Sequence, residues 1–332
     1  MSAGQSAIDG APGIPEIAAA AVVGSGYMGG GIAQSLALAG VDVVLADADA
    51  ATATRNLERL LREGTVFEGA GLFPPGSADV LREHLRAAAS IEEAVADVDM
   101  VEEAVPENPA LKQEVLSRVE SAARPDAIIG SNTSTIPVHV LSQALRDPSR
   151  FLTVHFSNPA PFIPGVELVM GETTRPEVVT AVEALLVRMG RRSATVADVP
   201  GFVLNRLQYA LLLEAMAVVE EGVASPADVD TVVSTTFGFR LPFFGPFAIA
   251  DMAGLDTYVG GLGVLAAARG DRFAPPKVLT DLVGSGRLGV KAGGGFYDLG
   301  PEQMAALVAY RDRAYVAMAR LLEELGPSPL TP

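Results

Sequence analysis

The sequence contains no cysteine and few basic residues. Without cysteine it can form no disulfide, which suits a reducing compartment. Its 24 lysines and arginines are outnumbered by 40 aspartates and glutamates, so the formal net charge is −16. A protein that binds nucleic acid needs a basic face to displace the counterions of the phosphates, and no basic run occurs here. We therefore expect no nucleic-acid partner.

Long apolar runs are also missing. The run from Ile17 to Val23 is far shorter than the about 20 residues that a membrane-spanning helix needs. The first 14 residues are small and polar and hold no Arg or Lys, which predicts a flexible tail rather than a signal or transit peptide. We expect a soluble, cytoplasmic protein with no membrane partner.

The length and composition of the chain predict a large hydrophobic core. The chain has 332 residues, of which 49% are hydrophobic and 19% charged, so it is not disordered. At roughly 100 to 200 residues for each domain, this length favours two domains.

The first half of the chain alternates between strand and helix patterns. An apolar strand (18–23), a helix (29–39) and a second strand (41–46) form a βαβ unit, which builds a parallel sheet. Further strands are predicted at 100–105, 127–130, 151–156 and 166–169, and helices at 108–123 and 176–189. The Gly/Pro-rich segment 64–80 predicts a surface excursion. After residue 198 only helix and loop patterns remain.

The turn after the first strand carries the motif G-x-G-x-x-G at residues 24–29. Gly24 permits a tight turn, Gly26 lets the backbone approach a pyrophosphate, and Gly29 lets the helix pack on the strand. Asp47 ends the second strand, where a carboxylate binds ribose hydroxyls, and no arginine immediately follows it, which favours NAD over NADP. The alternatives are a plain glycine turn, or FAD in the same kind of motif.

These patterns define the predicted architecture. The fold class is α/β, with a Rossmann-like doubly wound parallel sheet followed by a smaller all-α domain. We expect a flexible tail at 1–14, an NAD-binding domain at 15–198 and an all-α substrate and dimerisation domain at 199–332.

Only three histidines occur. His84 lies among charged residues and His139 follows Pro137, so we expect both to be solvated. His155 ends the apolar strand 151–154, and ligands of open α/β sheets bind beyond the carboxyl ends of the strands. No cluster of His, Asp or Glu has the spacing of metal ligands, so we predict no metal site.

The chain resembles the 3-hydroxyacyl-CoA dehydrogenase family, including 3-hydroxybutyryl-CoA dehydrogenases, from about residue 17 to 300. The matching segments are GSGYMGGGIA (24–33), EAVPEN (103–108), SNTS (131–134), HFSNP (155–159), VPGFVLNR (199–206), GPFAIADMAGLD (245–256) and GVKAGGGFYD (289–298). Their order and spacing are more specific than any one motif.

The resemblance implies roles for single residues. It makes His155 the catalytic base, Glu167 its carboxylate partner, and Ser134 and Asn205 the residues that hold the substrate oxygen. The cofactor-binding residues that it implies are Gly24, Gly26, Tyr27, Met28, Gly29, Asp47, Glu107, Lys112 and Asn132. It also implies an oxidoreductase that acts on a hydroxyl group, takes part in fatty acid metabolism and forms a homodimer.

The chemistry agrees with these roles. Oxidation of a secondary alcohol removes a proton from oxygen and a hydride from carbon; imidazole has a suitable pKa for the proton, and a nicotinamide takes the hydride. The simpler interpretations are a structural histidine at 155, a strand-end ion pair at Glu167, a turn residue at Ser134, a helix cap at Asn205 and a solvated charge at Lys112.

The sequence departs from the family where the substrate is expected. Typical acyl-CoA members carry lysines between residues 48 and 111 that meet the CoA phosphates, and none occurs here, although Arg55, Arg59 and Arg62 could replace them. Glu102 replaces an expected apolar residue. The loops at 155–167 and 237–256 look more like a subgroup that acts on free carboxylic acids, 5-formyl-3-hydroxy-2-methylpyridine-4-carboxylate 5-dehydrogenase among them.

Three functions therefore stay open. The first is oxidation of a 3-hydroxyacyl-CoA, or a similar 3-hydroxyacyl substrate, by hydride transfer to NAD. In the second, the substrate is a small or aromatic free acid that bears an alcohol or aldehyde; Arg240 could pair with its carboxylate, and Phe243 or Phe244 could line an aromatic pocket. The third is a non-catalytic NAD-binding structural protein, which would not need all four catalytic residues.

Overall fold

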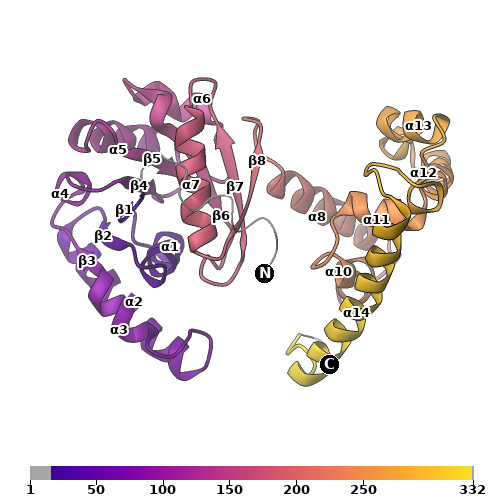
Figure 1. The fold of residues 1–332 in the computed structure, drawn as a ribbon, viewed down its shortest axis with the longest axis horizontal. Helices are drawn as coiled ribbons and strands as arrows, with labels where there is room; N and C mark the ends of the chain where they lie inside the picture. The colour runs from indigo at the N-terminus through magenta and orange to yellow at the C-terminus, as the bar shows by residue number, and fades with distance from the viewer. Residues whose placement is uncertain (1–15, 331–332) are drawn as a thin grey trace. The chain divides into compact units, whose positions relative to one another are not determined.

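A computed structural model describes residues 16–330, so the expected tail at 1–14 lies outside the described residues. These residues form two compact units, one ending at Ala210 and one beginning at Leu211. Figure 1 colours the chain from the first unit to the second. Each unit is described by itself.

The first unit is built on one eight-stranded sheet with the order β3-β2-β1-β4-β5-β6-β7-β8. The strands are β1 (Ala19–Val23), β2 (Asp42–Ala46), β3 (Leu85–Ala87), β4 (Met100–Glu103), β5 (Ile128–Ser131), β6 (Phe151–Phe156), β7 (Gly165–Met170) and β8 (Arg192–Val196). The strand order reverses between β1 and β4, so the carboxyl ends of these strands form the crevice where open α/β sheets bind ligands.

The sheet is parallel except at one pair. β7 runs antiparallel to β6, and this register places His155 directly opposite Glu167. Only residues 157–164 connect the two strands, whereas a parallel pair needs a crossover of about a dozen residues or more. The predicted doubly wound α/β fold is confirmed, with this antiparallel exception.

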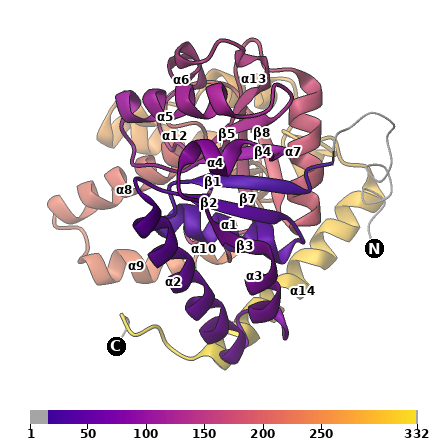
Figure 2. The ribbon, with the colours of Figure 1, turned by 90° about the vertical axis from the view of Figure 1, so that its left-hand side faces the viewer.

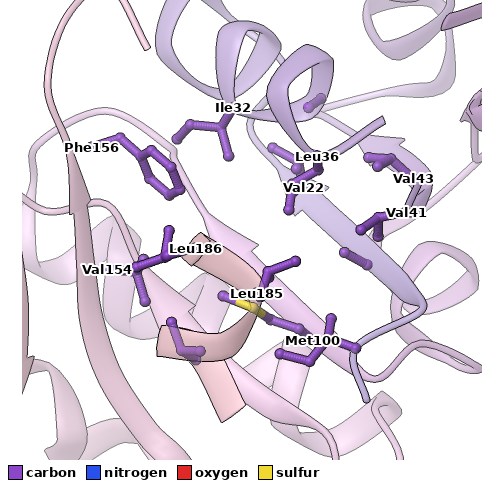
Figure 3. Close-up of a cluster of buried hydrophobic side chains, with 14 of the residues drawn as sticks. Val22, Ile32, Leu36, Val41, Val43, Met100, Val154, Phe156, Leu185 and Leu186 are labelled. Atoms are coloured by element: carbon purple, nitrogen blue, oxygen red, sulfur yellow. The ribbon is translucent and has the colours of Figure 1, made fainter. Parts of the chain in front are cut away.

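Helices cover both faces of the sheet. In Figure 3, Ile32 and Leu36 of α1 point toward Val22 of β1, and Leu185 of α7 lies in the same buried cluster. The other face packs against α4, α5 and α6. The helices of this unit are α1 (Tyr27–Leu38), α2 (Ala50–Gly69), α3 (Ser77–His84), α4 (Ile91–Val95), α5 (Pro109–Ala122), α6 (Val138–Leu141) and α7 (Pro176–Arg188), with 3-10 turns at Ser142–Ala144 and Pro148–Arg150.

Most of the segment 64–80 lies at the surface, as expected, but much of it is helical. α2 continues to Gly69 and α3 begins at Ser77, so the two helices form a hairpin (Figure 2). Glu68 closes the short connection, because its carboxylate accepts hydrogen bonds from the backbone N–H groups of Gly76 and Ala78 at 2.9 and 2.8 Å. These two hydrogen bonds hold the pKa of Glu68 below its usual value.

Two strands were not predicted. β3 has only three residues, and β8 is largely exposed or half-buried, so neither shows a clear apolar pattern. Both lie at an edge of the sheet, where a strand has one neighbour. The other predicted elements occur with ends shifted by one or two residues.

The second unit is helical. It holds the C-terminal part of α8 (Leu204–Glu220), followed by α9 (Pro226–Thr235), α10 (Phe237–Arg240), α11 (Pro246–Ala253), α12 (Leu255–Arg269), α13 (Lys277–Gly284) and α14 (Pro301–Leu325), with 3-10 turns at Asp271–Phe273 and Val290–Ala292. Its buried Asp251 accepts hydrogen bonds from the N–H groups of Phe296 and Tyr297, so the GGGFYD loop is structural here. Within residues 16–330, every helix is too short or too polar to cross a bilayer.

Candidate active site

The glycine turn between β1 and α1 is tightly packed on two sides and open on the third. A Cβ on Gly24, whose φ is +97°, would lie 2.7 Å from the backbone of Ala104, and one on Gly29 would lie 1.8 Å from the Gly24 carbonyl oxygen. A Cβ on Gly26 would meet no atom within 4 Å. Two of the glycines are therefore required by packing, and the third leaves space for a ligand beside the first turn of α1. N–H groups in a first turn lack acceptors within their own helix and favour phosphate.

Asp47 faces this turn from the end of β2. Its Oδ2 accepts hydrogen bonds from the backbone N–H of Ser25 at 2.8 Å and from its hydroxyl at 2.6 Å. Oδ1 accepts only from the N–H of Ala48, at 2.8 Å, and keeps a free lone pair. The open side of Gly26 and this carboxylate fit the pyrophosphate and ribose of a dinucleotide. Tyr27 is 67% exposed, and Met28 is half-buried.

His155 and Glu167 form a buried pair at the ends of β6 and β7. Nδ1 of His155 lies 2.8 Å from Oε2 of Glu167, and the exposed fractions of the two side chains are 4% and 12%. A carboxylate accepts, so Nδ1 carries the proton and Nε2 of the neutral ring has a free lone pair. No described residue bonds to Nε2. The ring of Phe202 packs beside the imidazole at a centroid distance of 5.8 Å.

The second oxygen of Glu167 holds the start of α8. Oε1 accepts hydrogen bonds from the backbone N–H groups of Val203 and Leu204, both at 2.9 Å. Phe202, immediately before them, has a φ of +48°, which is uncommon for a residue other than glycine. Glu167 thus joins the histidine to the first turn of the helix that carries Asn205.

Asn205 and Glu107 position the loop that contains Ser134. Nδ2 of Asn205 donates to the backbone carbonyl of Ser134 at 2.8 Å, which leaves its second N–H available. Oε1 of Glu107 accepts from the N–H groups of Ser134 and Thr135 and from the hydroxyls of Thr133 and Thr135, at 2.8 to 3.0 Å. Burial raises the pKa of Glu107, but the hydrogen bonds from Thr133 and Thr135 and the charge of Lys112 outweigh it, so its pKa lies below the usual value.

Lys112 is buried in an ion pair. It is 1% exposed, and its Nζ lies 2.8 Å from Oε1 of Glu103 and 3.0 Å from the carbonyl oxygen of Val105. Glu103 also accepts from the hydroxyl of Ser131 at 2.6 Å. The alternative of a solvated helix charge at Lys112 is therefore wrong, because its ammonium group is taken up by buried acceptors next to the Glu107 loop.

The remaining predicted polar residues are also placed. Asn132 accepts a hydrogen bond from the N–H of Phe156 at 2.8 Å, which ties the ends of β5 and β6 together. His84 and His139 were expected to be solvated; the side chain of His139 is 64% exposed, as expected, and that of His84 is 23% exposed. Nδ1 of each also lies 2.7 Å from a carboxylate, that of Asp42 for His84 and that of Asp198 for His139. Residues 16–330 contain no group of three or more His, Asp or Glu that could hold a metal ion.

Glu102, the next residue along β4 from the pair-forming Glu103, points to the opposite face of the sheet. It is 1% exposed, and neither carboxyl oxygen has a hydrogen-bond partner within residues 16–330. Burial raises the pKa of Glu102 well above its usual value, and the neighbouring charge of Glu103 adds to the effect. Glu102 is therefore a buried carboxyl group whose surroundings favour the protonated form, at a position where the family resemblance leads us to expect an apolar residue.

The candidate substrate residues lie in the second unit. The rings of Phe243 and Phe244 pack against Tyr315 of α14, both at 6.2 Å, and Phe244 is 6% exposed. Phe244 is thus part of this unit's core. Arg240 ends α10, and its guanidinium has no partner among the residues described.

Of the arginines considered for CoA, Arg59 is already engaged. Its guanidinium pairs with Glu63 at 2.9 Å and donates to the carbonyls of Ser25 and Gly26, both at 3.2 Å. Arg55 donates to the hydroxyl of Thr52. The pair of Arg59 and Glu63 follows the i,i+4 spacing of a helix, whereas no local pattern predicts the contacts of Arg59 with Ser25 and Gly26.

Comparison with known proteins agrees with this geometry. A model of the NAD-binding domain of 3-hydroxyacyl-CoA dehydrogenase matches residues 19–199, and one of the C-terminal domain matches residues 201–299. The chain is 38% identical over 304 residues to 5-formyl-3-hydroxy-2-methylpyridine 4-carboxylate 5-dehydrogenase of Mesorhizobium japonicum, covering 91% of this chain and 97% of that protein. It is 36% identical over 284 residues to a probable 3-hydroxybutyryl-CoA dehydrogenase of Bacillus subtilis, covering 85% of this chain and 98% of that protein.

A solved structure agrees as well. The 3-hydroxyacyl-CoA dehydrogenase of Archaeoglobus fulgidus is 34% identical, with a TM-score of 0.75, and the match covers 93% of this chain and 99% of that one. The chain therefore belongs to the 3-hydroxyacyl-CoA dehydrogenase family of NAD-dependent dehydrogenases, and its first unit carries the family's NAD-binding domain.

Proposed function

We propose that the protein oxidises the hydroxyl group of a 3-hydroxyacyl thioester, such as a 3-hydroxyacyl-CoA, to the 3-oxo product with NAD, and that His155 is the general base. The observation that carries this proposal is the buried pair of His155 and Glu167, which fixes the proton on Nδ1 and leaves Nε2 as an acceptor. The relatives named 3-hydroxybutyryl-CoA dehydrogenase support the choice of substrate.

One group of residues in the site would bind the cofactor. The residues that would hold NAD are Gly24, Gly26, Tyr27, Met28, Gly29 and Asp47, with Glu107, Lys112 and Asn132 beside them. When bound there, NAD would supply the acceptor for the hydride of the substrate carbon.

The proton of the substrate hydroxyl goes to His155. Nε2 of His155 accepts it from the substrate hydroxyl, and the carboxylate of Glu167 stabilises the imidazolium that results. The hydroxyl of Ser134 and the second N–H of Asn205 donate to the oxygen as it becomes a carbonyl. Glu107 and Asn205 support this role, because together they fix the backbone of Ser134 on both sides.

A second candidate substrate is a small or aromatic free acid that bears an alcohol or aldehyde. The similarity to the pyridine carboxylate dehydrogenase of Mesorhizobium japonicum favours it. The guanidinium of Arg240, which pairs with no other described residue, is the cation that we propose for the substrate carboxylate, with Phe243 beside it, whereas Phe244 packs in the core of the second unit.

We also propose a domain boundary at 198–200, supported by the two family models, which meet at residues 199 and 201.

We propose that the second domain forms a homodimer. The supporting observation is an apolar set of side chains on α8 that are between 48% and 67% exposed: Leu207, Leu212, Leu213 and Met216. We further propose a cytoplasmic location and a role in fatty acid metabolism; relatives named as fatty acid oxidation complex subunits, of whose length the chain covers 39%, support the second of these. A monomeric mass in solution scattering would reject the dimer.

The assignment is tested by following NADH formation from 3-hydroxybutyryl-CoA and from a panel of free hydroxy acids and aromatic alcohols or aldehydes. Turnover of the thioester supports the first proposal. Turnover of a free acid alone supports the second, and then Arg240→Ala should raise KM for that acid. If NAD binds and none of these compounds is turned over, two alternatives are left: a substrate carried by acyl-carrier protein, and a non-catalytic NAD-binding protein.

A further inference from the structure

A pocket of about 250 Å³ lies in the first unit between α1, α2 and the loop that follows β6. Six of the residues that line it are Tyr27, Arg59, Glu63, Phe67, Pro161 and Phe162. Tyr27 belongs to the first turn of the cofactor helix, and Pro161 and Phe162 belong to the loop after the strand that carries His155. The pocket therefore shares residues with the cofactor helix and with the loop that follows the catalytic strand.

One side of the pocket is aromatic. The rings of Phe67 and Phe162 lie 5.5 Å apart at an interplanar angle of 72°, and Phe73 packs against both, at 5.1 and 5.8 Å. Phe73 is 5% exposed, whereas Phe162 is 41% exposed. Edge-to-face aromatic clusters of this kind accept a further ring, because each face or edge that stays free can make the same contact.

The charges beside the pocket do not favour an anion. Arg59 is the only cation among the residues that line it, and its guanidinium is paired with both oxygens of Glu63, at 2.9 and 3.0 Å, and with two backbone carbonyls. A phosphate or carboxylate would find no free cation here and would meet the charge of Glu63. The pocket thus suits an uncharged group.

The walls are fixed before a ligand binds. The guanidinium of Arg191 donates to the carbonyls of Pro161 and Ile163, at 3.0 and 3.1 Å, and to the hydroxyl of Ser35 on α1. On the other side, Nε2 of Gln34 donates to the carbonyl of Leu60 and joins α1 to α2. A preformed pocket binds more tightly, since no side chains or loops must be ordered.

The volume of the pocket limits the size of the group that it can hold. An apolar cavity of about 150 Å³ can hold benzene, so 250 Å³ accommodates one six-membered ring with a short substituent, and is small for a nucleotide. We infer that this pocket binds a single uncharged aromatic ring of the substrate, so that the preferred substrates are hydroxy compounds with such a ring. This inference rests on the proposed oxidation at His155 and names the substrate class of that site.

Two measurements test it on the full-length protein with NAD. The first compares kcat/KM for 3-hydroxy-3-phenylpropionyl-CoA and 3-hydroxybutyryl-CoA. The second detects binding of 1-phenylethanol by saturation-transfer NMR, which needs no turnover. The variants are Phe162→Ala and the more conservative Phe67→Leu. The matched control is Val66→Ala, because Val66 is adjacent on α2, 65% exposed and outside the pocket.

We expect the wild type to prefer the phenyl substrate by about tenfold, the range that a few buried carbons give in a hydrophobic pocket. Phe162→Ala should remove that preference through KM and abolish the NMR signal, Phe67→Leu should weaken both, and Val66→Ala should change neither. Turnover of 3-hydroxybutyryl-CoA without a phenyl preference or NMR signal would overturn the pocket and leave the proposed function. An NMR signal lost only in the pocket variants, with no turnover of any substrate, would support the pocket and overturn the function.

Discussion

Glu167 lies opposite His155 in the antiparallel pair of β6 and β7 and contacts Nδ1 of that histidine at 2.8 Å. Its other oxygen accepts hydrogen bonds from the backbone N–H groups of Val203 and Leu204, where α8 begins. One carboxylate therefore sets both the tautomer of the histidine and the start of the helix that positions Asn205.

This double role separates two substitutions. In Glu167→Gln the amide oxygen can still accept from α8, but its NH2 group then faces Nδ1 and favours the tautomer with the proton on Nε2. We expect kcat to fall by about 10²- to 10⁴-fold with little change in Tm. Glu167→Ala should lose the same activity and also about 1–2 kcal/mol of stability, since two N–H groups lose their acceptor. Equal thermal unfolding of the two variants would contradict the role at α8.

A substitution at Lys112 tests the buried ion pair of Lys112 and Glu103. Removal of its side chain in Lys112→Ala leaves the fully buried Glu103 without its cation, which costs about 3–5 kcal/mol. The control is Lys277→Ala, because the Lys277 side chain is 85% exposed and its pair with Asp281 is worth at most about 1 kcal/mol. Urea unfolding measures both changes. A loss below about 1 kcal/mol for Lys112→Ala would mean that Glu103 is hydrated or protonated in the fold.

Replacement of Glu102 by an apolar residue is expected to stabilise the protein. Burial raises the pKa of this carboxyl, so the folded protein keeps the proton that the unfolded chain releases above the usual Glu pKa. The free energy of unfolding therefore falls as the pH rises from the usual pKa toward the raised one, by up to about 1.4 kcal/mol per pH unit. Glu102→Leu should remove this dependence and unfold at higher temperature near neutral pH. A lower Tm for Glu102→Leu, measured across pH 5 to 8, would show that the carboxyl has a partner in solution.

Much of the first unit could be predicted, because its signals are local. The glycine turn, the strand that ends at His155 and the acid after β2 each depend on residues close together in sequence, and the structure brings His155, Glu167, Asn205 and Ser134 into one chain of contacts. Contacts between distant residues could not be predicted. Examples are the burial of Lys112, the contact of Arg59 with the glycine turn, and the lack of any partner for Glu102 within residues 16–330. Each depends on which parts of the chain meet in the folded protein, and single-sequence patterns do not carry that information.

The most direct test of the central claim is the rate of NADH formation from NAD and 3-hydroxybutyryl-CoA by the wild type and by His155→Ala, with equal folding of the two checked by circular dichroism. If His155 accepts the hydroxyl proton, the wild type turns over the thioester and the variant loses at least about 10²-fold in kcat while NAD binding stays unchanged. A variant that keeps the wild-type rate would contradict the assignment of His155 as the base.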